Sequence, residues 1–308
     1  MRRGNLRTLA LALVLGAALA ASCAPVGGGA DPTVSPGGED FAAAIALSVS
    51  AEAIYLVDPE NGRRRLVADG LRDFQAGYAA WASDHRRLAY GNGGIYVVDT
   101  ALAEETLLID GPAISMPAWS RDGKRIAYGD GLSLWITSAD SEEPARLQLP
   151  ETIAPIGMTW RPGDGIVFQG LALDCTTSLG CVSTEQSELF WIAPDGTGLR
   201  QITHVGHAEN PKWSPDGSSI LFVRRLGGKD GARSTELWQV NTDGTGLKQV
   251  FRLFDVVAAD WSPDGQTLAV LRKGEEARTL QLWTGDADGS NLRPLGTAVP
   301  GTHATIDW

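Results

Sequence analysis

Short apolar runs, bounded by turns rich in Gly, Asp and Pro, recur along most of the chain. The clearest follow a tryptophan, as in W-S-P-D-G-S-S-I-L-F-V from Trp213 and W-S-P-D-G-Q-T-L-A-V-L from Trp261. Pro presets φ in such a turn, Asp bonds nearby backbone amides, and Gly accepts positive φ. Because apolar β-forming residues flank the turn, the pattern predicts two antiparallel strands joined as a hairpin.

The tryptophan recurs six times, five times followed by a turn and a short apolar run, and self-similarity of this kind is typical of a repeat architecture. The repeated tryptophans, spaced by 38, 41, 53, 48 and 47 residues, are Trp81, Trp119, Trp160, Trp213, Trp261 and Trp308. A third strand with an aromatic residue begins near Ile54, Ile95, Leu134, Leu189, Leu237 and Leu282. A second glycine turn, as at 243–246, and a fourth short strand follow. Each repeat therefore predicts a four-stranded antiparallel meander.

One such sheet cannot bury both of its faces, and packing sheets around an axis solves the problem. The sequence thus predicts an all-β fold, a six-bladed β-propeller of four-stranded antiparallel blades with the repeated tryptophans wedged between blades. Residues 41–69 supply the second, third and fourth strands of a blade without a first, whereas 303–308 supply only a first strand. We therefore expect the C-terminal strand to join the N-terminal blade and close the ring.

The first forty residues are typical of an export signal and a tether. Arg2, Arg3 and Arg7 precede an apolar run at 9–21, which is too short to span a bilayer and fits a secretory signal. Small residues then lead to Cys23, as in a bacterial lipobox. We predict a lipoprotein signal peptide at 1–22, a lipidated Cys23 with a flexible linker at 23–40, and the propeller at 41–308. An ordinary signal peptide followed by an incidental cysteine is the alternative.

The W-S-P-D-G turn, the aromatic strand and the D-G-T-G-L turn occur in an order that resembles the TolB-type propeller repeat. The resemblance covers 41–308, is strong at Trp213 and Trp261, and is degraded at Trp81 and Trp160. Proteins similar to TolB carry an additional α/β domain before the propeller, where we expect only the linker here. The resemblance implies an extracytoplasmic propeller that presents one face to a partner.

Composition and charge narrow the function classes further. The 308 residues are 43% hydrophobic, which excludes disorder of the whole chain, and 37 Gly with 16 Pro argue against long helices. The formal net charge of −11 argues against nucleic-acid binding, which needs clustered Lys and Arg. Of the 3 cysteines, Cys175 and Cys181 remain after lipidation, and an exported chain is expected to pair them as a disulfide. Two free thiols or a two-cysteine metal site are the alternatives.

Catalytic motifs are absent from the sequence. There is no G-x-S-x-G, no P-loop and no H-E-x-x-H pattern, so we predict no catalytic residue, no cofactor and no metal site. His204 and His207 form H-x-x-H, which we interpret as loop or channel-mouth histidines. Asp286 and Asp288 resemble the start of a calcium loop but lack its later glycine and acid, so a hairpin turn is expected there.

Ligands and partners of propellers usually meet the mouth of the axial channel. Counting back from each tryptophan, the polar candidates for that mouth are Gln75, Tyr78, Ser115, His207, Glu209, Asn210, Asp255 and His303. Carboxylates and imidazoles around an axis could bind a cation or a small polar ligand, and ordinary polar lining is the plainer interpretation. Two insertions, around Cys175–Cys181 and at 225–231, extend loops of the kind that often carry function.

These observations predict a lipid-anchored, extracytoplasmic, monomeric propeller that acts as a non-enzymatic protein-binding module in a bacterial envelope. The expected partners are an envelope protein and, through the lipid, the membrane, but not nucleic acid. The alternative is an enzyme or a small-ligand or cation sensor that uses the channel mouth, since some six-bladed propellers are hydrolases, lactonases or cyclotransferases. An enzyme requires several of those side chains within hydrogen-bond reach of one bound atom.

Overall fold

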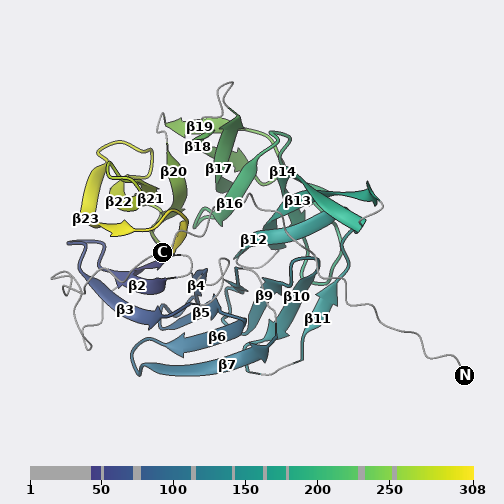
Figure 1. The fold of residues 1–308 in the computed structure, drawn as a ribbon, viewed down its shortest axis with the longest axis horizontal. Helices are drawn as coiled ribbons and strands as arrows, with labels where there is room; N and C mark the ends of the chain where they lie inside the picture. Colours follow the sequence, from purple (N-terminus) through teal and green to yellow (C-terminus); the bar gives the residue numbers. More distant parts are fainter. Residues whose placement is uncertain are drawn as a thin grey trace, which may run out of the picture.

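In the computed structural model, the chain forms six four-stranded antiparallel sheets arranged as blades around an axis (Figure 1). The structure describes residues 43–49, 52–71, 78–111, 116–140, 143–161, 165–177, 180–227, 233–251 and 255–308. No helix occurs among them. The predicted six-bladed β-propeller is therefore confirmed. The predicted signal peptide, Cys23 and the linker lie outside the described residues.

Each blade is a meander in which strands that follow one another in sequence pair side by side. Blade 1 contains β24 (Ala304–Asp307), β1 (Ile45–Val49), β2 (Ala53–Val57) and β3 (Arg64–Asp69). Blade 2 contains β4 (Ala79–Trp81), β5 (Arg87–Gly91), β6 (Gly94–Asp99) and β7 (Glu104–Asp110). Blade 3 contains β8 (Ala118–Trp119), β9 (Arg125–Gly129), β10 (Leu134–Ser138) and β11 (Ala145–Leu147).

The other three blades have the same order but longer strands. Blade 4 contains β12 (Ile153–Arg161), β13 (Gly165–Thr177), β14 (Gly180–Ile192) and β15 (Arg200–Gln201). Blade 5 contains β16 (Ala208–Trp213), β17 (Ser219–Gly227), β18 (Arg233–Asn241) and β19 (Lys248–Phe251). Blade 6 contains β20 (Val256–Trp261), β21 (Thr267–Lys273), β22 (Thr279–Asp286) and β23 (Arg293–Pro300).

The ring closes as the sequence predicts. Strand β24 pairs antiparallel with β1, from Ala46 opposite Asp307 to Val49 opposite Ala304. The indole Nε1 of Trp308 donates a hydrogen bond to the carbonyl oxygen of Ala43 at 2.7 Å. The last strand of the chain is therefore the inner strand of the first blade, and it covers the edge of β1 that would otherwise be unpaired.

The hydrophobic core consists of six clusters, one between each pair of neighbouring blades. Each cluster contains or packs against one repeated tryptophan. Trp81, for example, packs with Ile54 and Leu56 of blade 1 and with Leu88 of its own blade, and its Nε1 donates to the carbonyl of Ala44 at 2.9 Å. Truncating a buried tryptophan of this kind costs about 3–5 kcal/mol. Six separate interfaces, rather than one central core, hold the ring together.

The turns after the tryptophans explain why the repeat has its sequence. Ser214 Oγ donates to Asp216 Oδ1 at 2.6 Å, and Gly217 has a φ of +68°. In the degraded turn after Trp81, in blade 2, His85 occupies the glycine position and still has a φ of +49°. The turn geometry is therefore kept at some steric cost, since a residue with a Cβ disfavours this region.

Candidate functional site

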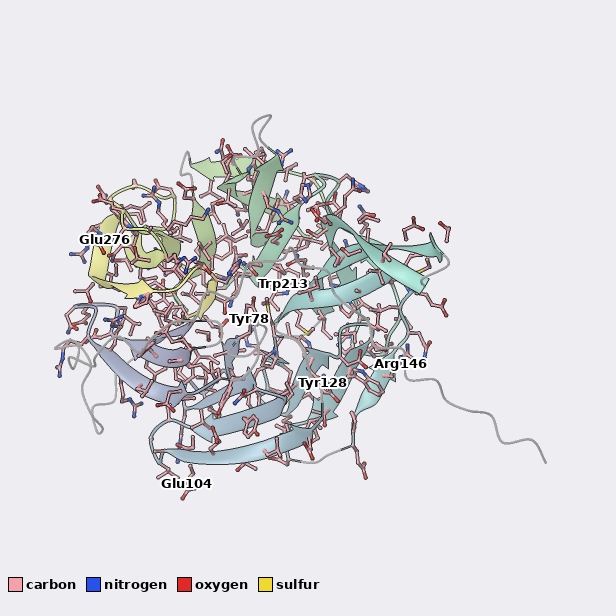
Figure 2. The ribbon with its side chains drawn as sticks, in the orientation of Figure 1. Tyr78, Glu104, Tyr128, Arg146, Trp213 and Glu276 are labelled. Atoms are coloured by element: carbon pink, nitrogen blue, oxygen red, sulfur yellow. A yellow bond between two sulfur atoms is a disulfide. The ribbon has the colours of Figure 1, made fainter. Side chains whose placement is uncertain are left out.

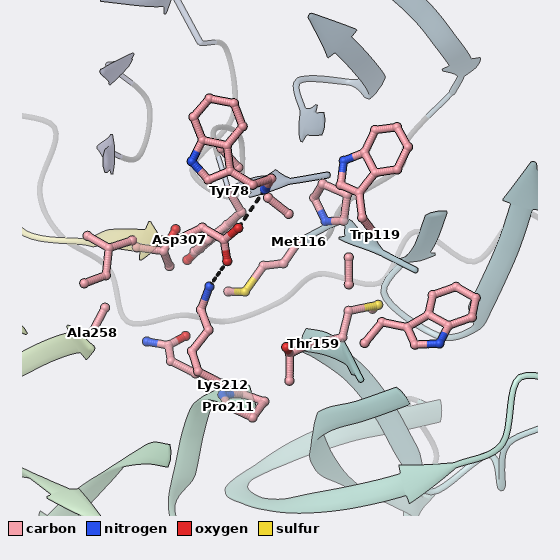
Figure 3. A pocket seen from close by; sticks show the side chains of 18 of the residues that line it. Tyr78, Met116, Trp119, Thr159, Pro211, Lys212, Ala258 and Asp307 are labelled. Carbon is pink, nitrogen blue, oxygen red and sulfur yellow. Dashed lines mark hydrogen bonds and ion pairs between the residues drawn. The ribbon is translucent and has the colours of Figure 1, made fainter. Parts of the chain in front are cut away.

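A partly open cavity of about 130 Å³ lies on the axis, and the inner strands of all six blades contribute to it (Figure 3). This volume is enough for several water molecules or a small ligand. Tyr78 and Trp213 lie near the centre of the molecule, whereas Glu104 and Glu276 lie at its periphery (Figure 2). The predicted channel-mouth residues are therefore expected to line this axial cavity.

The residue immediately before each repeated tryptophan lies on the other face of its inner strand, towards the next blade and the axis. These residues are Ala80, Ala118, Thr159, Lys212, Asp260 and Asp307. Blades 2, 3 and 4 supply the uncharged members, and blades 5, 6 and 1 supply the charged ones. The channel thus has an uncharged side and a charged side.

The three charged residues form one cluster, here termed the axial clasp (Lys212, Asp260 and Asp307). Lys212 Nζ donates to Asp307 Oδ1 and lies 3.2 Å from Asp260 Oδ2. Their side chains are only 16%, 9% and 19% exposed for Lys212, Asp260 and Asp307. The lysine of blade 5 therefore reaches carboxylates of both blade 6 and blade 1. Figure 3 shows its bond to Asp307 of blade 1.

Backbone amides complete the clasp. Asp307 Oδ2 accepts from the backbone N–H of Trp81 at 2.7 Å, and Asp260 Oδ2 accepts from that of Trp308 at 3.1 Å. Asp260 Oδ1 accepts from the N–H of Trp261 at 2.8 Å. Each aspartate thus bonds to the tryptophan of the following blade, so the clasp joins blades 5, 6, 1 and 2.

Burial and the neighbouring charges both shift the pKa values of the clasp residues. Burial alone lowers the pKa of Lys212, but the charges of Asp260 and Asp307 outweigh it and raise that pKa above its ordinary value. Burial raises the pKa of Asp260 to about 6, with Lys212 opposing and Asp307 adding to the rise. Lys212 is therefore positively charged at neutral pH, as a residue that binds two carboxylates must be.

The structure separates the predicted mouth residues into two groups. Tyr78 and Asn210 line the cavity, and Asn210 Nδ2 also donates to the carbonyl of Val257 in blade 6 at 3.0 Å. Gln75 and Ser115 lie outside the described residues. The remaining candidates do not line the cavity, and they are His207, Glu209, Asp255 and His303.

Those four residues stand at or near the start of the inner strands β16, β20 and β24, and all but His207 have local side-chain partners. Glu209 Oε1 pairs with Arg225 at 2.6 Å, and Asp255 Oδ1 lies 3.9 Å from Lys273 Nζ. Burial, together with the charge of Lys273, lowers the pKa of His303. None of the four side chains belongs to the cavity wall, although Glu209 adjoins Asn210 in sequence. These groups and the cavity-lining ones therefore do not form one site.

The three residues of the axial clasp are not among the site residues predicted from the sequence. A signal for it existed, because Lys212, Asp260 and Asp307 all stand one residue before a repeated tryptophan. In a propeller that register position faces the next blade and the axis, so a charged side chain there needs a partner. Alignment of the six repeats on this position would have found all three residues.

Other sequence candidates have plain structural roles. Gln201 Nε2 lies 3.0 Å from His204 Nδ1, and Asp286 Oδ2 accepts from the Asn291 side chain at 2.6 Å within a turn. In the described part of the chain, no three His, Cys, Asp or Glu side chains are grouped so as to hold a metal ion. None of the described residues forms a helix long and apolar enough to cross a membrane.

The two faces of the ring differ. Because strands alternate in direction, the W-S-P-D-G and D-G-T-G turns lie on one face, here termed the turn face. The hairpins between second and third strands, and the connections between blades, lie on the other, here termed the hairpin face. His207, Asp255 and His303 stand on the hairpin face, at or just before the start of an inner strand.

Three consecutive blades rise above the others on the hairpin face. Strands β13 and β14 have 13 residues each, β17 and β18 have 9 each, and β21 and β22 have 7 and 8, whereas β5 and β9 have 5. The second strand of each of these blades begins at a similar distance after its tryptophan, so the additional residues project from the hairpin face. Eight additional residues extend a strand by roughly 26 Å. The β13–β14 hairpin reaches beyond the ring in Figure 1.

A disulfide joins the two strands of this longest hairpin. Cys175 and Cys181 are bonded, six residues apart in sequence, next to the hairpin tip. Val182, the residue after the second cysteine, is 38% exposed. The disulfide therefore constrains a segment that the ring itself does not support.

No family model and no curated protein matches this sequence. Solved structures with a similar fold include TolB from Acinetobacter baumannii, with a TM-score of 0.67 and 16% identity over 88% of this chain and 68% of that one. An oligogalacturonate lyase in complex with manganese has a TM-score of 0.52 and 16% identity over 78% and 69% of the two chains. A gluconolactonase from Xanthomonas campestris has a TM-score of 0.54 and 14% identity over 83% and 82%.

The chain is thus a six-bladed β-propeller. Its architecture is TolB-like, as the resemblance of its repeats implied, and the match covers 68% of the TolB chain. Identities this low show the fold alone, and the similar folds include both TolB and enzymes. A shared fold does not determine function, which depends on the residues of each protein's own site.

Proposed function

We propose that this protein is a lipid-anchored, extracytoplasmic propeller that binds a protein partner in the bacterial envelope through its hairpin face and catalyses no reaction. The observation that carries the proposal is the asymmetry of that face. Blades 4, 5 and 6 raise long hairpins beside the low hairpins of blades 1, 2 and 3. A raised wall next to a low surface offers a partner two contact surfaces instead of one flat ring.

The disulfide at Cys175–Cys181 supports this function. A hairpin that projects from its sheet loses conformational entropy when it docks, and a covalent crosslink reduces that loss. A disulfide also belongs to an oxidising compartment, in agreement with the secretory pattern at 1–22. Lipidation at Cys23, followed by the linker, would keep the propeller at the membrane surface while it reaches its partner.

The chemistry of the channel supports binding rather than catalysis. In the described part of the cavity wall, the charged side chains Lys212 and Asp307 bond to each other, and Asp307 also accepts from the backbone amide of Trp81. The imidazoles and acids that the sequence suggests as alternative catalytic groups do not line the cavity. A catalytic site needs a nucleophile, acid or base whose reactive atom is free to meet the substrate.

Site-specific photo-crosslinking in the native membrane tests the proposal. The crosslinking residue is placed at Val182 or Glu276 on the hairpin face, and at Leu247 or Glu104 on the turn face as matched exposed controls. We expect one partner, identified by mass spectrometry, to be captured from the hairpin-face positions and to bind the purified propeller. Capture only from the turn face, or from all four positions alike, would contradict the assigned face.

A further inference from the structure

The axial clasp leaves one negative charge uncompensated beside the cavity. It contains two carboxylates and one ammonium group. The described residues that line the cavity include no other charged side chain besides Lys212 and Asp307. The amides of Trp81, Trp261 and Trp308 donate hydrogen bonds to the carboxylates but bring no net charge. Electrostatic interactions are strong at such a buried site, so the excess charge favours a cation nearby.

A hydroxyl group beside the clasp has no hydrogen-bond partner in the part of the chain that the structure describes. Thr305 lines the cavity and is 8% exposed, and its Oγ1 is buried without a hydrogen bond among the described residues. Its neighbours Ala304 and Ile306 pack in the core between blades 6 and 1. Side chains alternate along a strand, so Thr305 projects to the same side as Asp307, towards the cavity. A buried unpaired hydroxyl is unfavourable and indicates a missing partner.

The opposite wall of the cavity is apolar. Met116, Pro117, Ala118 and Met158 line it from blades 3 and 4. The volume of about 130 Å³ is close to the roughly 150 Å³ that accommodates a six-membered ring. A hydrated inorganic ion would not use this wall, whereas an organic body would bury apolar surface against it. The methionine side chains adapt readily to ligand shape.

We propose that the axial cavity binds a small organic monocation. Its ammonium group lies between the Asp307 carboxylate and the Thr305 hydroxyl, which accepts one of its hydrogen bonds. Its apolar body, of about six non-hydrogen atoms, packs against Met116 and Met158. The two carboxylates exclude anions, and the single excess charge favours a monocation. This site is independent of the hairpin face that the proposed function uses.

Calorimetric titration of the full-length protein tests the ligand class. Cyclohexylammonium is the probe, with cyclohexanol and cyclohexanecarboxylate as neutral and anionic isosteres, and with sodium, potassium and calcium ions as inorganic competitors at constant ionic strength. We expect one cyclohexylammonium per chain, bound about ten-fold or more tightly than cyclohexanol, with no carboxylate binding. Equal affinity for cyclohexanol, displacement by millimolar sodium or potassium, or no binding at all would each overturn the proposal.

Variants locate the site without touching the clasp. Thr305→Val keeps shape and β propensity, and it is expected to weaken cyclohexylammonium binding about five-fold while leaving the unfolding temperature unchanged or higher. Ala118→Leu fills the cavity and is expected to abolish binding. Thr152→Val, at an exposed position outside the cavity, is the matched control and should bind as the parent does. Unchanged binding in both Thr305→Val and Ala118→Leu would place the ligand elsewhere and overturn the assignment.

Discussion

Single charged residues at the axis do what the hydrophobic clusters cannot, because they connect more than two blades. Each hydrophobic cluster joins one pair of neighbouring blades. Lys212, by contrast, bonds to aspartates in two other blades, and Asp307 bonds on to Trp81 in a fourth. A buried charge without its partner is costly, so the clasp makes the blades depend on one another.

Asp307→Asn tests that dependence. The substitution keeps the side-chain shape but removes the charge that Lys212 binds, and we expect it to lower the free energy of unfolding by about 2–4 kcal/mol. Asp255→Asn is the control, because Asp255 meets Lys273 at 3.9 Å in an exposed pair and should cost less than about 0.5 kcal/mol. Chemical denaturation measures both, and equal losses in the two variants would contradict a special role for the clasp.

We expect the free energy of unfolding to depend on pH through the single residue His303. Its folded-state pKa lies below the ordinary value of 6.5, because burial and then the charge of Lys273 oppose protonation. The unfolded chain therefore binds a proton more readily, and the free energy of unfolding should fall as the pH drops from 6.5 towards the folded pKa. His303→Gln should remove this part of the decline. Chemical denaturation at pH 7.5 and 5.5 compares the parent protein with His303→Gln. An equal fall in the free energy of unfolding in both would contradict the prediction.

Among the strands, the short β24 closes the ring by completing blade 1. Four residues pair with β1, supply Asp307 to the clasp and lead into Trp308. Deleting 303–308 would expose the inner edge of β1 and remove the aromatic contact to Ala43. We expect the truncated chain to unfold or to associate through that edge. A monomer with an unchanged melting temperature, seen by light scattering and circular dichroism, would show that closure does not stabilise the ring.

The β13–β14 hairpin is the element whose order depends on a covalent bond. A disulfide across so short a loop contributes about 2 kcal/mol in chain-entropy terms, and only to the hairpin that it closes. Replacing Cys175 and Cys181 by serine should therefore leave the global melting transition almost unchanged and make the hairpin tip sensitive to protease. Limited proteolysis with mapping of the cleavage site is the measurement. A large fall in the global melting temperature would mean that the hairpin supports the ring.

At the scale of the whole molecule, we expect membrane attachment and partner binding to depend on different parts of the chain. Cys23→Ser removes the proposed lipid-bearing thiol, and one acyl-modified residue is what would hold the chain at a membrane. We expect the variant to leave the membrane fraction while the purified propeller still binds the partner captured from Val182. Fractionation by ultracentrifugation measures the first effect. Retention of the variant in the membrane would favour an uncleaved or different attachment.

The repeat pattern by itself determined the architecture. W-S-P-D-G turns, apolar strands and aromatic third strands specify hairpins locally, and six copies of one meander can bury their faces only by packing around an axis. The incomplete repeats at 41–69 and 303–308 also predicted that β24 pairs with β1. These features are readable because they depend on short-range spacing and on the two-residue period of a strand.

Tertiary structure alone decided which side chains meet. Lys212 and Asp307 are 95 residues apart, and Asp260 and Trp308 are 48 apart, so only the closed ring makes them neighbours. Register shifts between Glu209 and Lys212, and between Val256 and Ala258, change which residues face the axis, and a simple count along the sequence does not contain them. Tyr78 and Asn210 therefore line the cavity while His207, Glu209, Asp255 and His303 do not, because contact at an axis depends on the height and rotation of every strand around it.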